Sequence, residues 1–354
     1  MHGIVYADPQ EEGFSRHKWG RGFTYRDEGG KRLTDPSHLR RIDELVIPPA
    51  WVQVWICPNP MGHIQVVGRD ERGRRQYIYH PAFRAARETE KFERLTAFAQ
   101  ILPRLRRRVA TDMASPGLGR NKVLATIVYL LDRTLIRIGN QAYARDNGSF
   151  GLSTLRNGHV EVAGSTVRFS FKGKSHKEWR VAIFDRRVGR IIRACQELPG
   201  QHLFQYRDEE GLLRNVSSDE VNEYLRRAAR RPVSAKDFRT WGGTVLCGLA
   251  LSLAPPAPTP TQLKRQLASA IRAVSHRLGN TPAVCRSSYI HPAIVSAHAE
   301  GLLARYARRM SHASAYENRL TPAERAVLRI LNGKVESRSV VGNDIENTVL
   351  AAAA

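Results

Sequence analysis

The hydrophobic pattern of the chain changes its period near residue 80, and this change limits the folds that the chain can adopt. Between residues 51 and 79, short alternating runs of apolar and polar residues are separated by turns that contain Gly and Pro. Alternation with a period of two is typical of strands, and short runs joined by tight turns predict an antiparallel meander. From Pro81 onward, apolar residues recur at spacings of three and four, which predicts helices.

These patterns assign the chain to the α+β class, with a small antiparallel β domain followed by a larger, mostly α-helical domain. The expected strands of the first part are 51–56, 63–67 and 76–79, whereas the residues before about 45 give weak signals. We place the boundary near residue 90. The expected parts are a β-rich domain over 1–90, a larger domain over 91–345, and a tail over 346–354 that frays because nothing holds a chain end.

A second, three-stranded sheet is expected inside the helical part. A hairpin pattern surrounds Ala163-Gly164-Ser165, and a third apolar run follows a Lys-Gly-Lys turn. The expected strands are 160–162, 167–171 and 178–183. The chain beyond residue 183 is expected to be helical. The expected helices are 83–93, 98–110, 122–136, 234–253, 261–276 and 292–310, with two more that start at Ser217 and Thr321.

The charge of the chain points to a polyanionic partner. The sequence holds 56 Lys and Arg against 33 Asp and Glu, a formal net charge of +23 at pH 7. Repulsion at this level opposes a compact fold unless a polyanion shares the surface, and nucleic acid is favoured over an anionic membrane. No apolar run approaches the ~18 residues of a membrane span, and no secretory leader is seen at the start. We therefore expect a cytoplasmic protein with no membrane partner.

The sequence offers no pattern for a metal or a nucleotide cofactor. Its four cysteines stand far apart without a C-x-x-C pair, which favours reduced thiols over a zinc site or disulfides. No H-E-x-x-H motif and no carboxylate cluster suited to two-metal chemistry occurs. Gly173-Lys174-Ser175 is similar to the end of a phosphate-binding P-loop, but Arg168 stands where its first glycine is required. We expect no cofactor.

Two tyrosines share one face of the last expected strand of the β domain. Tyr77 and Tyr79 are two residues apart, and an arginine cluster, Arg72, Arg74 and Arg75, precedes them. Packing into the core is one interpretation of this pair. A sheet face laid against nucleic acid is the other. The residues alone leave both interpretations open.

One tyrosine, Tyr289, lies in a run of small polar residues after a turn and a short helix that begins with Pro282. A phenol with a pKa near 10 is a poor nucleophile unless its neighbours stabilise what it attacks. Attack on a phosphodiester calls for guanidinium groups on the phosphate oxygens and a proton donor for the leaving alkoxide. Three cations stand at plausible positions: Arg137 after an expected helix, Lys174 in an expected β-turn, and Arg239 early in an expected helix. In so basic a chain, a surface cation or a generic phosphate contact is the favoured interpretation of each one taken singly, so the pattern alone does not select them.

A series of motifs in chain order resembles the bacterial, poxvirus-like type IB DNA topoisomerases of the tyrosine recombinase/topoisomerase IB superfamily. The resemblance covers residues from about 40 to about 310. In the β domain it is carried by 42–51, Trp55-Ile56-Cys57-Pro58, 62–65, 68–70 and 73–81. In the larger domain it is carried by 136–140, 171–174, 236–241 and 287–290.

The resemblance implies an ATP-independent and metal-independent enzyme that relaxes supercoiled duplex DNA. Tyr289 would form a 3′-phosphotyrosyl bond, Arg137 and Arg239 would hold the scissile phosphate, and Lys174 would be the general acid. The two domains would close around DNA as a clamp, and the protein would act as a monomer on the nucleoid. The positions that match DNA contacts of the family are Arg74, Gln76, Tyr77, Tyr79 and Tyr143.

The chain departs from the family at Asn280, nine residues before Tyr289, where the family usually has a histidine. An amide group donates to a phosphate oxygen without carrying charge, so Asn280 is assigned to the catalytic set with a changed pH dependence. His276 and His291 are near in sequence, but neither holds the matching position.

Two other functions are considered. A tyrosine site-specific recombinase shares the chemistry, but such enzymes typically have H-x-x-R where this chain has Lys236-Asp237-Phe238-Arg239. They also lack the N-terminal domain that carries the Trp-Ile-Cys-Pro motif. A basic nucleoid-binding protein without activity leaves the cations and Tyr289 unexplained.

Overall fold

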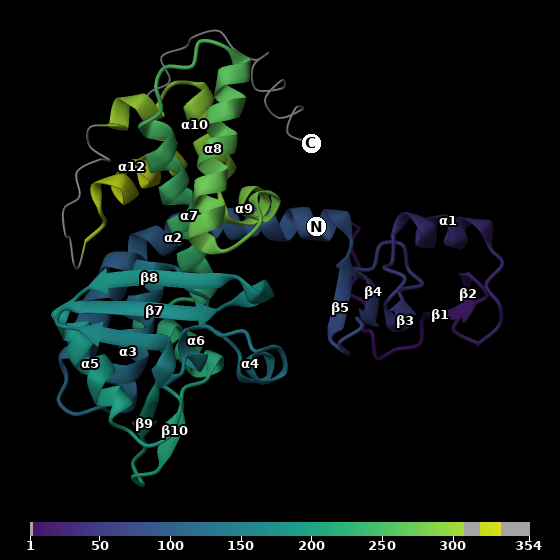
Figure 1. Cartoon of the computed structure of the whole chain (residues 1–354). Helices are drawn as coiled ribbons and strands as arrows, with labels where there is room; N and C mark the ends of the chain where they lie inside the picture. The colour runs from purple at the N-terminus through teal and green to yellow at the C-terminus, as the bar shows by residue number, and fades with distance from the viewer. Residues whose placement is uncertain (1–2, 308–318, 334–354) are drawn as a thin grey trace. The chain divides into compact units, whose positions relative to one another are not determined.

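A computed structural model describes residues 3–307 and 319–333 of the chain (Figure 1). Its internal contacts divide the chain into two compact units, residues 1–93 and 94–354. Each unit is described by itself. The functional bounds of 1–90 and 91–345 stay predictions, and the tail over 346–354 lies outside the described residues.

The first unit is built on a five-stranded sheet with the order β2-β1-β3-β4-β5, in which every neighbouring pair is antiparallel. The antiparallel sheet expected from the period of two is therefore confirmed. The residues before 45, which gave weak signals, supply two of its strands and a helix. The elements are β1 (Phe14–Trp19), β2 (Gly22–Arg26), α1 (Pro36–Glu44), β3 (Val52–Ile56), β4 (Ile64–Arg69) and β5 (Arg75–Tyr79).

The core of the first unit lies between one face of this sheet and α1. Ile42 of α1 is buried against Val54, Ile56 and Val66 of the central strands. Asp35 caps α1, because its carboxylate accepts a hydrogen bond from the backbone N–H of Ser37. On the opposite face, the side chains of Tyr77 and Tyr79 at the edge strand β5 are exposed.

The second unit is mainly helical and also holds a three-stranded and a two-stranded sheet (Figure 1). Its helices are α2 (Pro81–Ala114, which begins in the first unit), α3 (Arg120–Thr134), α4 (Gln141–Asn147), α5 (Arg186–Gln196), α6 (Ser218–Ala229), α7 (Ala235–Ser252), α8 (Pro260–Leu278), α9 (Pro282–Tyr289), α10 (Pro292–Ala299) and α12 (Pro322–Leu331). Its strands are β6 (Val160–Ala163), β7 (Thr166–Lys172), β8 (Glu178–Phe184), β9 (Gln205–Arg207) and β10 (Leu213–Asn215).

Three expectations about these elements were wrong. The helices expected at 83–93 and 98–110 are one helix, α2, because residues 94–97 contain no Gly or Pro to end it. The chain beyond 183 is not wholly helical, since β9 and β10 pair across a turn in which Asp208 accepts from the N–H of Leu212. The helix expected over 292–310 ends at Ala299, before Gly301 at a φ of +70°. Residues 308–310 lie outside the described residues.

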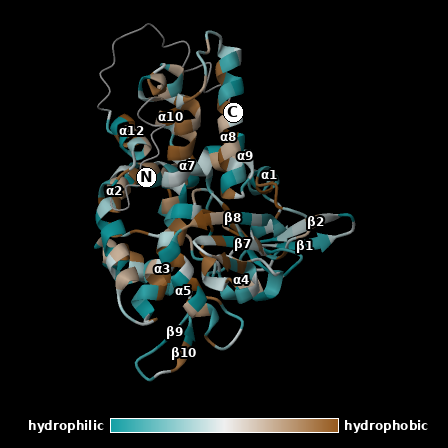
Figure 2. Cartoon of the chain, turned by 60° about the vertical axis from the view of Figure 1, so that its left-hand side comes forward, coloured by the Kyte–Doolittle hydropathy of each residue, from teal (hydrophilic) through white to brown (hydrophobic). Residues whose placement is uncertain are grey.

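The helix α7 is the centre of the second unit. It contacts α3, α8, α9, α10 and α12, and α7 and α8 lie side by side. Much of α7 is hydrophobic in Figure 2, and its buried residues include Phe238, Trp241, Cys247 and Leu251. Its half-buried positions, which include Val245, Leu246 and Leu249, are apolar as well, so this part of the helix shows no polar face.

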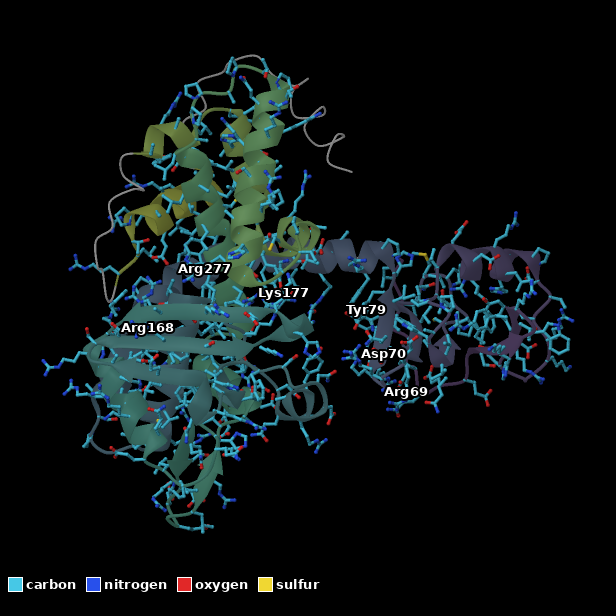
Figure 3. All side chains as sticks on the ribbon, in the orientation of Figure 1. Arg69, Asp70, Tyr79, Arg168, Lys177 and Arg277 are labelled. Carbon is cyan, nitrogen blue, oxygen red and sulfur yellow. The ribbon has the colours of Figure 1, made fainter. Side chains whose placement is uncertain are left out.

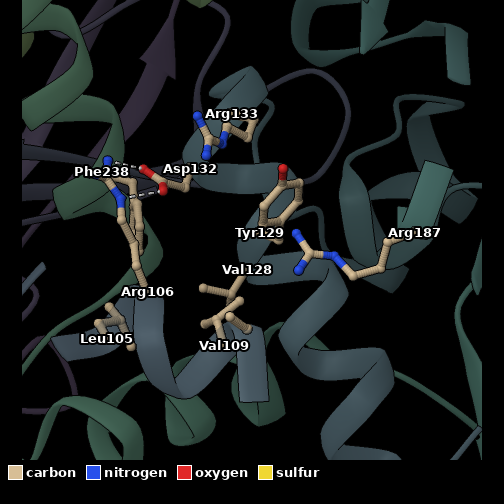
Figure 4. Close-up of a pocket in the computed structure, with 10 residues that line it drawn as sticks. Leu105, Arg106, Val109, Val128, Tyr129, Asp132, Arg133, Arg187 and Phe238 are labelled. Carbon is tan, nitrogen blue, oxygen red and sulfur yellow. Dashed lines mark hydrogen bonds and ion pairs between the residues drawn. The ribbon is translucent and has the colours of Figure 1, made fainter. Parts of the chain in front are cut away.

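A buried ion-pair network ties four helices together beside a small pocket (Figure 4). Arg106 of α2 pairs with Asp132 of α3 at 2.8 Å and with Glu324 of α12 at 2.7 Å. Trp241 of α7 donates from its indole nitrogen to Glu324 at 3.0 Å. Glu324 is 6% exposed, so its charge depends on these partners.

We expect Glu324→Ala to lower the free energy of unfolding by about 3–5 kcal/mol, because it leaves the buried Arg106 without one of its partners. Burial raises the pKa of Glu324, but Arg106 lowers it by a larger amount. The pKa in the folded protein therefore lies below that of an ordinary glutamate. The stability that the native chain has over Glu324→Ala is therefore fully present above the ordinary pKa of a glutamate. It shrinks as the pH falls through the lowered pKa of Glu324 in the folded protein. Urea unfolding followed by circular dichroism at several pH values measures both effects. Glu300→Ala, at an exposed position, is the control, and an equal loss there would contradict this role of Glu324.

Candidate active site

Tyr289 is the last residue of α9 and is half-buried against α7. The hydroxyl of Thr244 on α7 donates to the carbonyl of Tyr289 at 3.3 Å and accepts from the N–H of His291 at 3.1 Å. Gly243 of α7 lies so close to the backbone of Tyr289 that a Cβ at this position would come within 2.7 Å of the Tyr289 carbonyl oxygen. The backbone of Tyr289 is thus fixed to α7.

Arg239 lies in the second turn of α7 and is 4% exposed. Its Nη1 donates to the carbonyl of Leu135 and its Nη2 donates to the carbonyl of Leu278 at 2.8 Å. Its guanidinium carbon lies 5.3 Å from the centre of the Tyr289 ring. The remaining donor, Nε, is buried and makes no hydrogen bond to any of the described residues.

Arg137 lies in the extended segment that follows α3. Leu135 ends that helix in the left-handed region, at a φ of 58°, and so turns the chain toward the site. The carbonyl of Arg137 accepts from the N–H of Leu152 at 2.8 Å, and a Cβ at Gly151 would approach this carbonyl to 2.5 Å. Close backbone contact therefore sets the position of Arg137.

Asn280 lies in the turn between α8 and α9 and is 9% exposed. Its Oδ1 accepts a hydrogen bond from Nη2 of Arg137, and its N–H donates to the carbonyl of Ser275 at 3.0 Å. Its Nδ2 is buried and, like Nε of Arg239, has no hydrogen-bond partner among the described residues. The bond to Arg137 fixes the orientation of the amide.

The electrostatics of this cluster favour an anion. Burial raises the pKa of Tyr289, but Arg239, Arg137 and the nearby Asn280 amide together lower it by a larger amount. The pKa of Tyr289 therefore lies below the ordinary value of a phenol. Burial, followed by repulsion from Arg137, lowers the pKa of Arg239 to about 10. Both guanidinium groups remain charged at neutral pH. Two buried cations next to a phenol suit a phosphate and a developing phenolate.

Lys174 differs from the other predicted catalytic residues. It is exposed on the turn between β7 and β8, whereas Tyr289, Arg137, Arg239 and Asn280 lie together. The side chain from this turn that contacts the cluster is Lys177, whose Nζ donates to the carbonyl of Asn280 at 3.0 Å. Sequence analysis missed Lys177, because one more lysine in a basic chain carries no signal.

The neighbouring histidines take no part in the cluster. His276 is exposed in the last turn of α8. His291 caps α10, where its Nδ1 accepts from the N–H of Ala293 at 3.1 Å, and burial lowers its pKa to about 4. Neither ring replaces Asn280.

The predicted DNA contacts of the first unit gather on β5 and the turn before it. Arg74 and Gln76 both donate to the carboxylate of Asp70, and Arg74 holds the pKa of Asp70 down to about 2. Tyr77 and Tyr79 stack with their ring centres 5.9 Å apart, and they are 40% and 38% exposed. Tyr79 stands on an open face rather than in the core (Figure 3), and Tyr77 is likewise exposed. In the second unit, Tyr143 lies half-buried on α4.

Residues 3–307 and 319–333 contain no group of three His, Cys, Asp or Glu side chains placed to hold a metal ion. None of the helices in these ranges combines the length and the apolar character that a membrane span needs.

Comparison with known proteins places the chain among enzymes that act on DNA topology. The family model of the catalytic core of eukaryotic DNA topoisomerase I matches residues 80–313, and that of the N-terminal domain of bacterial DNA topoisomerase IB matches residues 22–70. DNA topoisomerase 1B of Acanthamoeba polyphaga mimivirus is 32% identical over 79% of this chain and 85% of its own. DNA topoisomerase 1B of vaccinia virus is 24% identical over 73% of this chain and 78% of its own.

These matches show that the chain is a type I DNA topoisomerase, an enzyme of the isomerase class that binds DNA. Within that class, the chain belongs to the type IB DNA topoisomerase family, as the motifs of the sequence indicated. Both family models describe DNA topoisomerases, which favours the topoisomerase over the site-specific recombinase.

If Tyr289 is the nucleophile, as the sequence predicts, Gly243→Ala should slow formation of a covalent DNA adduct by roughly tenfold or more. The new Cβ displaces the Tyr289 backbone, and small displacements at a reacting group are costly. DNA binding should not change, and alanine itself favours the helix. Single-turnover cleavage and a binding titration measure the two quantities. Gly158→Ala is the control, since a Cβ there meets nothing within 4 Å. Unchanged cleavage by Gly243→Ala would show that the Tyr289 backbone position is not critical.

Proposed function

We propose that this topoisomerase relaxes supercoiled duplex DNA by cutting one strand transiently, with Tyr289 as the nucleophile. The observation that carries the proposal is the pair of buried donors beside the phenol. Arg239 Nε and Asn280 Nδ2 make no hydrogen bond to the described residues, although burial of an unpaired donor is unfavourable. A scissile phosphate is the anion that would engage both donors.

The proposed reaction exchanges one phosphodiester for another. The Tyr289 hydroxyl gives up its proton to solvent, and its oxygen bonds to phosphorus. The bond from phosphorus to the 5′-oxygen breaks, and a 3′-phosphotyrosyl link results. Arg137 and Arg239 bind the non-bridging oxygens, which gain charge in the transition state, and Asn280 Nδ2 adds a neutral hydrogen bond. Lys174 gives its proton to the leaving 5′-oxygen.

Relaxation follows from the lifetime of this link. The cut strand swivels about the intact one, and the 5′-hydroxyl then attacks the phosphotyrosine and restores the original bond. The free energy of the phosphodiester is kept in the enzyme link, so neither ATP nor a metal ion is required.

We also propose that the two units close on duplex DNA as a clamp. The face of β5 would contact the duplex through Arg74, Gln76, Tyr77 and Tyr79, and Tyr143 would contact it from the second unit. Arg74 and Gln76 are held by Asp70 in the free protein, which orients them for a duplex. The enzyme would act as a monomer, in the cytoplasm, on the nucleoid.

Tyr289→Phe should bind duplex DNA normally but form no covalent adduct and relax no supercoils, because the attacking oxygen is missing. Denaturing gel electrophoresis of the adduct and plasmid relaxation test both effects. Tyr306→Phe, at another half-buried tyrosine of the second unit, serves as the control and should keep both activities. Residual relaxation by a clean Tyr289→Phe preparation would assign the attack to another residue.

Relaxation should persist in EDTA without any nucleotide, on plasmids that carry no repeat or recombination site. It should weaken steeply as salt rises, since each phosphate contact that forms releases counterions. Plasmid relaxation over a salt series measures both properties. An absolute need for ATP or for a divalent ion would contradict the proposed reaction.

A further inference from the structure

The turn that carries Lys174 is tied to the active-site cluster by another lysine. Lys177, three residues further along, donates from Nζ to the backbone carbonyl of Asn280 at 3.0 Å. Lys177 lies at the end of β8 that faces the base of α8 (Figure 3). The hydrogen bond joins the turn between β7 and β8 to the turn between α8 and α9.

Trp179 makes a second connection between the same two turns. A Cβ at Gly173 would come within 2.6 Å of the indole nitrogen of Trp179, and a Cβ at Gly279 would come within 2.8 Å of its Cζ2. The indole is 7% exposed and stacks on Phe171, with ring centres 6.1 Å apart. One rigid side chain thus packs against the residue before Lys174 and against the residue before Asn280.

The backbone of the turn is strained and needs external support. Ser175 and His176 both adopt the left-handed region, with φ values of 60° and 55°. Consecutive residues other than glycine persist in this conformation only where their surroundings hold them. The N–H of Gly173 donates to the carbonyl of Lys177 at 2.8 Å and closes the turn, so Lys177 anchors it through its backbone as well as its side chain.

We propose that Lys177 is a positioning residue for strand cleavage, whose hydrogen bond to the Asn280 carbonyl holds the turn of Lys174 in register with Tyr289. The inference rests on the proposed function, in which Lys174 donates the proton. Lys177 itself transfers no proton in this scheme. Its loss removes one of the two contacts described above, leaves the packing of Trp179 in place and lets the exposed turn move, so that Lys174 meets the 5′-oxygen less often.

The test compares two duplex substrates, one normal and one with sulfur in place of the bridging 5′-oxygen at the cleavage site. A thiolate leaves with little protonation because thiols are far stronger acids than alcohols, so cleavage of the sulfur substrate bypasses the general acid. Lys177→Met removes the donor and keeps the apolar stem, whereas Lys177→Arg keeps a donor. Lys172→Met is the matched control, an exposed lysine of β7 before the same turn.

At saturating enzyme, we expect Lys177→Met to cleave normal DNA at a rate lower by roughly tenfold or more, because a catalytic group is displaced. On the sulfur substrate, the same variant should approach the native rate. Lys177→Arg should recover most of the loss, and Lys172→Met should be near native on both substrates. Lys174→Ala with Lys177→Met should be no slower on normal DNA than Lys174→Ala alone, because both changes remove one proton transfer.

Two results would overturn the inference while leaving the proposed function intact. One is an unchanged rate for Lys177→Met on normal DNA. The other is equal slowing on both substrates, which marks a phosphate contact. If Lys177→Met recovers on sulfur and Lys174→Ala does not, Lys177 is itself the acid, and the positioning role and the role of Lys174 both fail. Loss of adduct formation by Tyr289→Phe is scored separately and tests the nucleophile alone.

Discussion

The buried guanidinium of Arg239 is the interaction on which the site depends. It joins the carbonyl that ends α3, at Leu135, to the carbonyl that ends α8, at Leu278, and it does so from within α7. Each helix end otherwise presents carbonyls without partners, and their negative dipole ends attract the cation. The segments that carry Arg137 and Asn280 begin at these two helix ends, so one side chain brings three elements together beneath Tyr289.

A neutral amide at position 280 suits a site that already holds two cations. Oδ1 of Asn280 accepts from Arg137, which a protonated imidazole could not do, because it offers donors only. An amide also adds no third charge next to Arg239, whose pKa is already lowered by burial and by Arg137. The site therefore combines two fixed charges with one neutral donor that does not titrate.

Patterns along the chain predicted the elements that are regular and missed those that depend on local detail. The sheets β3–β5 and β6–β8 followed from alternation and turn residues. The strands β1 and β2 were missed because glycine and charge interrupt their alternation, although β1 is stabilised by pairing with β3 and β2 by pairing with β1. The two expected helices of 83–110 merged into α2, since residues 94–97 hold no Gly or Pro, and Pro103 lies inside the helix without ending it.

The sequence by itself determined the period change near residue 80, the basic charge, and the family to which the motifs belong, because these properties are written in residue types and their spacing. It also named Tyr289, Arg137, Arg239 and Asn280, but through resemblance rather than chemistry. Only the tertiary structure decided that these four lie together, that Lys174 remains exposed, and that Lys177 contacts Asn280. Such contacts join residues about a hundred positions apart, and their formation depends on the helix ends and glycine packing that bring those positions within hydrogen-bonding distance.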